Sequence, residues 1–373
     1  MTASAGVDDA VAALAAGDVV GLPTETVYGL AADAASREAV AKIYRIKGRP
    51  ADHPLIVHVL GEPQARLWGQ WNPLAQRLVD AFWPGPLTIV LPRLPRAPAW
   101  ACAGHATIAL RSPSHPLARE VMDRLLAIGI TGIAAPSANR FGRVSPTSAA
   151  HVRTDLGDEV PVVLEGGDAD VGVESTIVDV SRGRAVLLRP GHVGAQEIAA
   201  ALGEPVGSPD QDAPRVSGSL ASHYAPATPV VLGDAAQLDA VLAQALADRR
   251  RVALWSLAPP ARPDAFVSWR AQPQTAAAME HDLYRMLREL DGSGADLILI
   301  ESPPADQAWA AVDDRLRRAA ISAASPLRRP DEHAPRRGAR PAAAARSRPA
   351  SSHRIARCRP RARGAGQVCQ ELP

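Results

Sequence analysis

Short apolar runs alternate with amphipathic stretches along the first 202 residues, and this alternation constrains the fold more than any other feature. Runs of this length, bounded by Gly or Pro, are typical of strands that are covered on both faces. The expected strands are 19–22, 54–60, 86–91, 107–111 and 130–136. Helical patterns lie between several of them, at 7–16, 36–46, 73–82 and 116–128. The pattern predicts that residues 1–202 form an α/β domain.

Composition divides the remaining chain into three segments. Residues 203–228 are rich in Gly, Pro, Ser and Asp and are expected to form a linker. Residues 229–324 are expected to form a second, smaller α/β domain of the three-layered, Rossmann-like kind. Its expected strands are 229–233, 251–256 and 296–301, and its expected helices are 235–248, 276–290 and 309–320. Residues 325–373 are mainly Arg, Pro, Ala and Ser without periodicity, which predicts a disordered tail.

The distribution of charge and cysteine argues against several classes of protein. Residues 325–373 contain twelve Arg and three acidic residues, so the rest of the chain is mildly acidic although the formal net charge is +2. An acidic body with 4% aromatic residues argues against a protein that coats nucleic acid. Three cysteines without a CxxC pair predict neither a disulfide framework nor a structural zinc site. We expect no signal peptide, no membrane span and a cytoplasmic location.

Polar residues follow several of the expected strands. The turn 23–29 (PTETVYG) carries hydroxyls where an open sheet holds ligands, although the same hydroxyls could simply satisfy the backbone of the turn. Lys47 and Arg49 lie on one loop and form a candidate clamp for a polyphosphate, although such loops are more often solvated charge. His53 precedes the next strand and His58 lies within it, where a lone histidine is more often a core residue than a ligand. The clustering of these groups around one strand favours a site.

Two further segments carry candidate ligands. Arg111 ends the strand 107–111 and must reach an anion or solvent, because burial of an unpaired charge is costly. Residues 135–148 (APSANRFGRVSPTS) begin with a polar turn at the carboxyl end of a strand. In the same segment, Ser145 followed by Pro146 is predicted to cap a helix, and a helix N-terminus can also bind phosphate.

The last polar groups occur at two more expected strands and in the linker. Ser175 opens one strand and Arg189 ends the other. His223 and Tyr224 lie in the linker, where they either pack on a domain surface or cover a ligand. The sequence contains no GxxxxGK[ST] loop, GxGxxG fingerprint, HExxH, GxSxG or carboxylate cluster at metal spacing, so we expect no protein-bound metal. The residues thus predict a non-Walker anion site that binds a nucleotide without a covalent intermediate.

Seven blocks in this order resemble the YrdC-domain family. They are PTETVYGL, KGRPADHPLIVHV, WPGPLTIVL, TIALRSPSHPLA, APSANRFGRVSPTSA, GVESTIVDV and LLRPG. The HYAP element and the stretch that ends in DDRLRRAA are similar to the longer, two-domain form of the family. The resemblance implies a twisted open sheet with a concave cleft. It also implies a nucleotidyltransferase that makes threonylcarbamoyl-AMP and pyrophosphate from L-threonine, bicarbonate and ATP for the modification of tRNA.

The resemblance also implies roles for individual residues. The implied threonine contacts are Thr26, His58, Arg111, Ala135 (through its backbone) and Ser175. The implied ATP contacts are Arg49, His53, Thr107, Ser137, Ser145, Arg189 and Tyr224. Lys47 and Arg49 are expected beside the phosphates as the catalytic cations, with Mg2+ arriving on ATP.

Two other functions remain open from the sequence. One is a non-catalytic RNA-binding module, against which the acidic body and the sparse aromatic residues count. The other is a relative that forms carbamoyl-adenylate, although the zinc-finger and acylphosphatase-like segments of such proteins have no counterpart here. Expected partners are the downstream proteins that transfer the threonylcarbamoyl group to tRNA, and tRNA itself is a candidate.

Overall fold

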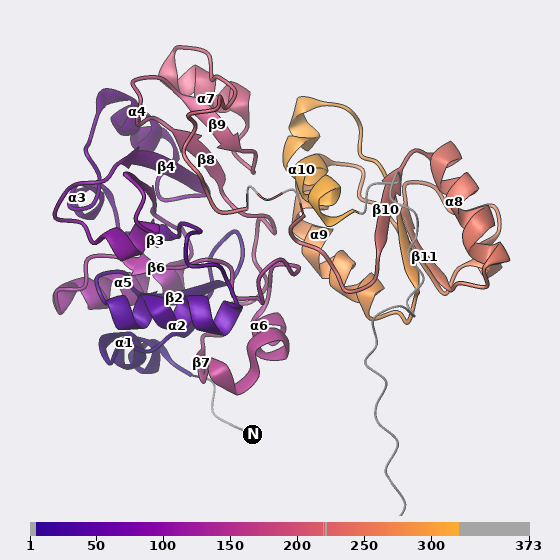
Figure 1. Ribbon diagram of the computed structural model, residues 1–373, viewed down its shortest axis with the longest axis horizontal. Coiled ribbons are helices and arrows are strands. Elements are labelled where there is room, and N and C mark those ends of the chain that lie inside the picture. Colours follow the sequence, from indigo (N-terminus) through magenta and orange to yellow (C-terminus); the bar gives the residue numbers. More distant parts are fainter. Residues whose placement is uncertain (1–4, 219, 221, 321–373) are drawn as a thin grey trace, which may run out of the picture. The chain divides into compact units, whose positions relative to one another are not determined.

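The computed structural model describes residues 5–218, 220 and 222–320 (Figure 1). The segment 325–373, for which the sequence predicts disorder, lies outside the described residues. Within the described ranges, no helix combines the length and the apolar character needed to cross a bilayer.

The first sheet is mixed and has nine strands among the described residues. They are β1 (Val20–Leu22), β2 (Gly29–Asp33), β3 (Ile56–His58), β4 (Leu87–Pro92), β5 (Thr107–Arg111), β6 (Ile133–Ala134), β7 (Val162–Val163), β8 (Thr176–Asp179) and β9 (Val186–Arg189). Their order is β7-β1-β2-β6-β3-β5-β4-β8-β9. The pairs β1–β7, β3–β5 and β4–β8 are parallel, and the other neighbours are antiparallel. The predicted α/β sheet is confirmed.

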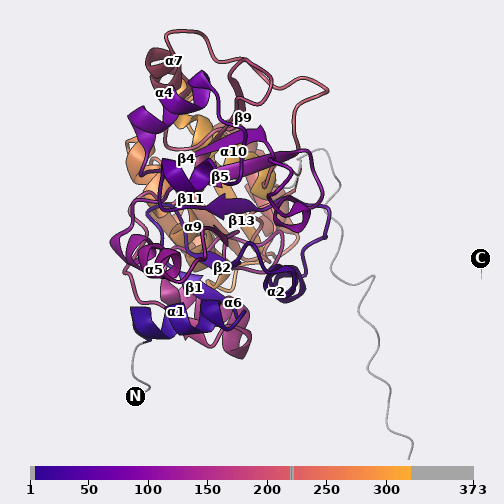
Figure 2. The ribbon, with the colours of Figure 1, turned by 90° about the vertical axis from the view of Figure 1, so that its left-hand side faces the viewer.

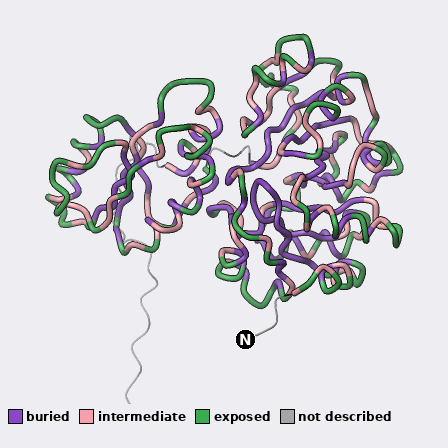
Figure 3. Tube along the Cα trace, turned by 180° about the vertical axis from the view of Figure 1, so that it is seen from behind, coloured by how far each residue is buried: buried purple, intermediate pink, exposed green. Residues whose placement is uncertain are grey.

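Helices cover both faces of this sheet. They are α1 (Val7–Ala15), α2 (Arg37–Lys47), α3 (Glu62–Ala65), α4 (Pro73–Phe82), α5 (Pro116–Ala127), α6 (Ala149–Leu156) and α7 (Ala195–Leu202). Helices α1 and α5 share one apolar cluster with β1 and β2, and α2, α4 and α7 share another with the opposite face. Figures 1 and 2 show α4 and α7 side by side at one end of the sheet. The buried parts of the trace in Figure 3 follow these strands and the inner faces of the helices.

Because side chains alternate along β3 and β5, one face of these two strands packs into the core and the other face carries candidate site residues. In β3, Val57 packs into the large core, so Ile56 and His58 point to the other face. In the parallel neighbour β5, Ala109 and Arg111 pair with these two residues and share their face. This face is covered here by the segment 203–228, whose Val216 packs on Ile56 and Ala109. A histidine and an arginine are thereby placed beneath the linker.

The second sheet is smaller and entirely parallel. Its strands are β10 (Val230–Gly233), β11 (Val252–Ser256), β12 (Ser268–Ala271) and β13 (Leu297–Glu301), in the order β10-β13-β11-β12. Its helices are α8 (Ala235–Ala247), α9 (Ala276–Asp291) and α10 (Ala310–Ala319). Helix α8 packs on one face, and α9 and α10 pack on the other. The predicted three layers are confirmed, although the sequence reasoning missed β12, whose side chains are only partly buried.

Two local predictions have different outcomes. Ser36 caps α2 as predicted, because its hydroxyl accepts a hydrogen bond from the Ala39 amide at 3.2 Å. The predicted cap at Ser145 is wrong. Ser148 caps α6 instead, accepting from the amide of His151 at 3.3 Å, and Pro146 lies before the helix. The Ser-Pro pair imitates a cap, but Ser148 is the residue whose hydroxyl reaches the first free amides of the helix.

Candidate functional site

A pocket lies at the ends of β3 and β5, beneath the segment 203–228. Its lining residues are Thr26, Val27, Lys47, Arg49, Ile56, His58, Arg111, Ala135, Pro136, Ser137, Asn139, Phe141, Gly142, Glu174, Ser175, Arg189, Ser217, His223 and Tyr224. Four of these carry cationic side chains and one carries a carboxylate. The pocket is therefore built for an anion.

Lys47 ends α2 and is buried beside the polar turn that follows β6. Its ammonium donates to the backbone oxygens of Ser137 at 2.5 Å and Asn139 at 2.7 Å. Burial, with the charge of Arg49 close by, lowers the pKa of Lys47 well below its usual value. An anionic ligand would reverse that shift, because it would stabilise the ammonium.

Arg49 reaches the pocket because Gly48 takes a left-handed conformation (φ 62°) that ends α2 and turns the chain. Its guanidinium donates to the Pro54 oxygen at 2.9 Å and to the Ser217 hydroxyl at 3.4 Å. Its Nε is buried without a hydrogen-bond partner. Burial lowers the pKa of Arg49 to about 10, so the side chain stays charged at neutral pH. A buried donor without a partner is a plausible contact for a ligand oxygen.

Arg111 is 4% exposed and forms an ion pair with Glu25, with 2.7 Å between Arg111 Nη2 and Glu25 Oε1. The expectation that Arg111 reaches an anion or solvent is confirmed, and the anion is a carboxylate of the protein itself. Glu25 also accepts from the Ser114 amide at 3.1 Å. The sequence reasoning grouped Glu25 with the turn 23–29 but assigned it no role. An acid in that turn is a signal only once the turn between β1 and β2 is known to lie beside the end of β5.

His58 is buried beside Arg111, and its Nδ1 lies 3.4 Å from the Ile56 oxygen. Burial and the charge of Arg111 lower the pKa of His58 to about 3. The imidazole is therefore neutral at physiological pH. It can accept a hydrogen bond from a hydroxyl or amine of a ligand.

Arg189 and Ser175 also line the pocket. Arg189 donates to the Ser175 oxygen at 2.9 Å and to the Ser217 oxygen at 3.0 Å. The hydroxyls of Ser175 and Thr88 lie 2.7 Å apart. The contacts of Arg189 with these oxygens leave its charge without direct neutralisation.

The linker residues His223 and Tyr224 are buried against the pocket. Tyr224 has φ 61°, and its hydroxyl is buried without a hydrogen-bond partner. The ring of His223 lies 4.1 Å from that of Tyr224 and 5.8 Å from that of Phe141, measured between centroids. Burial lowers the pKa of His223 to about 3, so this ring is also neutral. The pair packs on the protein and lines the pocket. Whether it covers a ligand stays a prediction.

Three of the predicted ATP contacts do not line the pocket. Thr107 begins β5, four residues before Arg111 on the same face. His53 lies outside, with its ring 5.3 Å from that of Phe141. Ser145 is wholly buried, and its hydroxyl donates to Glu174 at 2.5 Å.

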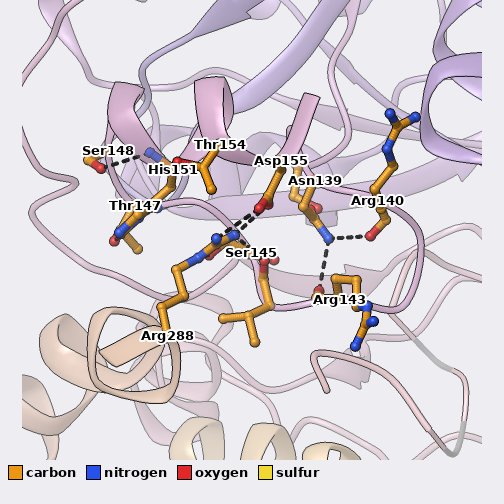
Figure 4. Close-up of polar contacts among 12 residues, drawn as sticks. Asn139, Arg140, Arg143, Ser145, Thr147, Ser148, His151, Thr154, Asp155 and Arg288 are labelled. Atoms are coloured by element: carbon orange, nitrogen blue, oxygen red, sulfur yellow. Dashed lines mark hydrogen bonds and ion pairs between the residues drawn. The ribbon is translucent and has the colours of Figure 1, made fainter. Parts of the chain in front are cut away.

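The other predicted residues line one pocket: Thr26, Lys47, Arg49, His58, Arg111, Ala135, Ser137, Ser175, Arg189 and Tyr224. Their binding roles stay predictions. Sequence reasoning assigned no role to Glu174, Asn139 or Phe141. The Asn139 amide nitrogen donates to the oxygens of Arg140 and Arg143, both at 2.8 Å, while its buried Oδ1 has no partner (Figure 4). The sequence did offer one signal for Glu174, because it is an acidic residue in the largely apolar block GVESTIVDV.

Comparison with known proteins places this chain in a family. The model described as "Telomere recombination" matches residues 12–191, and the model described as "Threonylcarbamoyl-AMP synthase, C-terminal domain" matches residues 193–321. Threonylcarbamoyl-AMP synthase of Pyrococcus abyssi is 35% identical over 315 residues, which cover 81% of this chain and 90% of that protein. The chain belongs to the threonylcarbamoyl-AMP synthase family. The family member of Bacillus subtilis is 39% identical over 327 residues, which cover 83% of this chain and 92% of that one.

A solved structure supports the same assignment to the threonylcarbamoyl-AMP synthase family. The crystal structure of Pyrococcus abyssi Sua5 complexed with L-threonine matches with a TM-score of 0.77 and 33% identity, covering 84% of this chain and 93% of that one. The resemblance to the YrdC-domain family, in its two-domain form, is thereby confirmed. The match includes both sheets, so the fold expected from the sequence is the fold of the family.

Proposed function

We propose that this protein is a threonylcarbamoyl-AMP synthase. It would convert L-threonine, bicarbonate and ATP to threonylcarbamoyl-AMP and pyrophosphate, and would therefore act as a nucleotidyltransferase. The observation that carries the proposal is the gathering of Lys47, Arg49, Arg111 and Arg189 in one pocket of a chain from this family. Such a pocket can take a carboxylate and a triphosphate together.

The threonine end of the pocket would be formed by Arg111, His58 and Thr26. Arg111 would bind the substrate carboxylate, with Glu25 holding the guanidinium in place. Neutral His58 would accept a hydrogen bond from the amine or the hydroxyl of threonine. The backbone of Ala135 completes this end. The amine, once deprotonated, attacks the carbon of bicarbonate, and loss of water leaves a carbamate on the threonine nitrogen.

The nucleotide end would be formed by Lys47, Arg49 and Arg189, with Ser137 and Tyr224. The carbamate oxygen attacks the α-phosphorus of MgATP, the bond to the β-phosphate oxygen breaks, and pyrophosphate leaves with that electron pair. Cations fixed before the reaction stabilise the charge that develops on the leaving group. His223 and Tyr224 would limit access of water to the carbamate. Positioning and electrostatics would supply the catalysis, without a covalent intermediate.

The product would pass to proteins that transfer the threonylcarbamoyl group to tRNA, which we propose as downstream partners in the cytoplasm. His53, Thr107 and Ser145 remain proposed contacts of the nucleotide at the margin of the pocket. This assignment would require the ligand to extend beyond the lining described above.

The test is the formation of product by the purified chain with L-threonine, bicarbonate and MgATP. Pyrophosphate release and threonylcarbamoyl-AMP, detected by mass spectrometry, are expected to require all three substrates. Consumption of ATP without threonine would favour the carbamoyl-adenylate alternative. Binding of RNA without any consumption of ATP would favour the non-catalytic alternative.

A further inference from the structure

Glu174 lies in the wall of the pocket, and helices of the second sheet supply two of its partners. Its Oε1 accepts from the Ser145 hydroxyl at 2.5 Å. Its Oε2 accepts from the Tyr284 hydroxyl at 2.7 Å and from Arg315 Nε at 3.0 Å. Tyr284 belongs to α9 and Arg315 to α10. The C-terminal part of the chain therefore supports the pocket wall through Glu174, although Tyr284 and Arg315 do not themselves line the pocket.

Arg315 has no exposed surface and binds several parts of this wall. Besides the carboxylate of Glu174, its guanidinium donates to the Pro190 oxygen at 2.9 Å and to the Glu174 backbone oxygen at 3.3 Å. It also lies over the ring of Tyr224, 5.3 Å from the centroid. Pro190 directly follows Arg189. Through Arg315, α10 thus contacts Glu174 and Tyr224, which line the pocket, and Pro190, the neighbour of the lining residue Arg189.

The charges explain why this contact matters for an anionic ligand. Glu174 and Arg189 are close enough for each charge to affect the pKa of the other. The hydrogen bonds of Arg189 go to oxygens of Ser175 and Ser217, so its charge is available to a phosphate. If Glu174 lost Arg315, its carboxylate would be balanced mainly by the cations of the pocket. It would then compete with the ligand for Arg189.

We propose that Arg315 is a positioning residue that engages the carboxylate of Glu174 and so leaves Arg189 free to bind the phosphates of ATP. The C-terminal domain then completes the nucleotide site through this ion pair. This inference rests on the proposed function, because it takes ATP as the ligand of Arg189.

The experiment measures the Kd of a non-hydrolysable ATP analogue by calorimetry on the full chain. Arg315→Met is expected to raise this Kd about tenfold, the equivalent of one lost charge interaction of moderate strength. The Kd of L-threonine is expected to change less. In the double variant Glu174→Gln, Arg315→Met, the competing carboxylate is gone, so the Kd of the analogue is expected to recover most of the loss. A purely structural role for Arg315 would not produce this recovery.

The chain offers a matched control in a second ion pair between α9 and the first domain. Arg288 of α9 pairs with Asp155 of α6 at 2.6 Å, outside the pocket lining (Figure 4). Asp155→Asn removes a similar contact without changing the charge near Arg189. Its Kd for the analogue is expected to stay within about twofold of the wild-type value.

Three results would overturn the inference. They are an equal rise of Kd in Arg315→Met and Asp155→Asn, an unchanged Kd in Arg315→Met, and a double variant as weak as the single one. If Arg315→Met does not fold, Arg315→Lys answers the question, because it keeps the charge. Its Kd should stay within about threefold of wild type, and a tenfold rise would contradict the proposal. A wild-type chain that binds no nucleotide would instead overturn the proposed function itself.

Discussion

Lys47 shows how one buried side chain can make ligand binding depend on pH. Its pKa is lowered by burial and by Arg49, so a rise of pH through that lowered pKa neutralises the ammonium of the free protein. A bound triphosphate favours the charged form, so binding takes up a proton. We therefore predict that the affinity for ATP falls as pH rises through the lowered pKa of Lys47, under conditions where the phosphates themselves are already ionised.

Calorimetry in buffers of different ionisation enthalpy measures this proton uptake directly. The chain has only two lysines, Lys42 and Lys47, which provides a matched pair. Lys47→Met should bind ATP more weakly and without the uptake. Lys42→Met, which removes a partly exposed partner of Asp18, should keep both the affinity and the uptake. Uptake that persists in Lys47→Met would assign the proton to another group.

Arg111 is predicted to act mainly on the binding of threonine. Arg111→Ala should raise the KM for threonine at least tenfold, because a charge-assisted bond to the carboxylate is lost, whereas Lys47→Ala should mainly lower kcat. Steady-state kinetics separates the two effects. Arg111→Ala should also lower the melting temperature, because Glu25 is left buried without its partner.

The control for this variant is Arg119→Ala on α5. Arg119 is partly buried and donates to the Leu60 oxygen at 3.2 Å, but it does not line the pocket. Its loss should leave the KM for threonine within about twofold. Equal and small kinetic effects of Arg111→Ala and Lys47→Ala would contradict the roles proposed for them.

At the scale of the element, the segment 203–228 depends on one glycine for its course over the pocket. Gly218 has φ 80°, and a Cβ at this position would lie 2.2 Å from the Tyr224 hydroxyl and 3.1 Å from Arg189 Nη1. Gly218→Ala must therefore displace Tyr224 or the segment. We predict a rise of about tenfold in the Kd of ATP, corresponding to about 1.4 kcal/mol.

Gly104→Ala separates this clash from backbone strain. Gly104 has φ 81°, but its Cβ would meet no atom within 4 Å. Both variants carry the same strain of about 1 kcal/mol, so both should lose similar stability from this source. Calorimetric binding should distinguish them, because only Gly218→Ala alters the pocket. Equal affinities in the two variants would argue against a role for the segment in binding.

At the scale of the whole molecule, Glu174 connects the two parts of the fold through Arg315. This contact makes the stability of the folded protein depend on pH. Burial alone would raise the pKa of Glu174, but Arg315, Arg189 and the hydrogen bonds from Ser145 and Tyr284 outweigh it and bring the pKa to about 2. The folded-state pKa is thus below the unfolded value of 4.5. The resulting stabilisation is present above pH 4.5 and is lost as pH falls towards 2.

We predict that Glu174→Gln unfolds at a lower temperature than the wild type at pH 7. The difference in melting temperature should shrink as pH falls below about 4.5, because the unfolded wild-type chain then binds a proton at Glu174 that the folded protein does not bind until about pH 2. Thermal unfolding followed by circular dichroism at a series of pH values measures this. A difference that stays constant between pH 7 and pH 3 would mean that the charge of Glu174 does not stabilise the fold.

The sequence by itself located most of the elements and most of the charged groups that line the pocket. The period of apolar residues and the residues at segment boundaries located β5 and α4. The loop after a helix located Lys47 and Arg49, and the end of an apolar strand located Arg111, because these signals arise from neighbours in the chain. β12 and the cap at Ser148 were missed. The burial of an edge strand and the geometry of a hydrogen bond depend on the folded structure and not only on neighbours in the chain.

Only the tertiary structure decided how these groups are paired. Glu25 meets Arg111 because the sheet brings the turn between β1 and β2 beside the end of β5, and Glu174 meets Arg315 because α10 packs near Pro190. These partners are separated by 86 and 141 residues in the chain. A buried charge requires a partner, but the sequence does not say which one, since that choice depends on how distant segments pack.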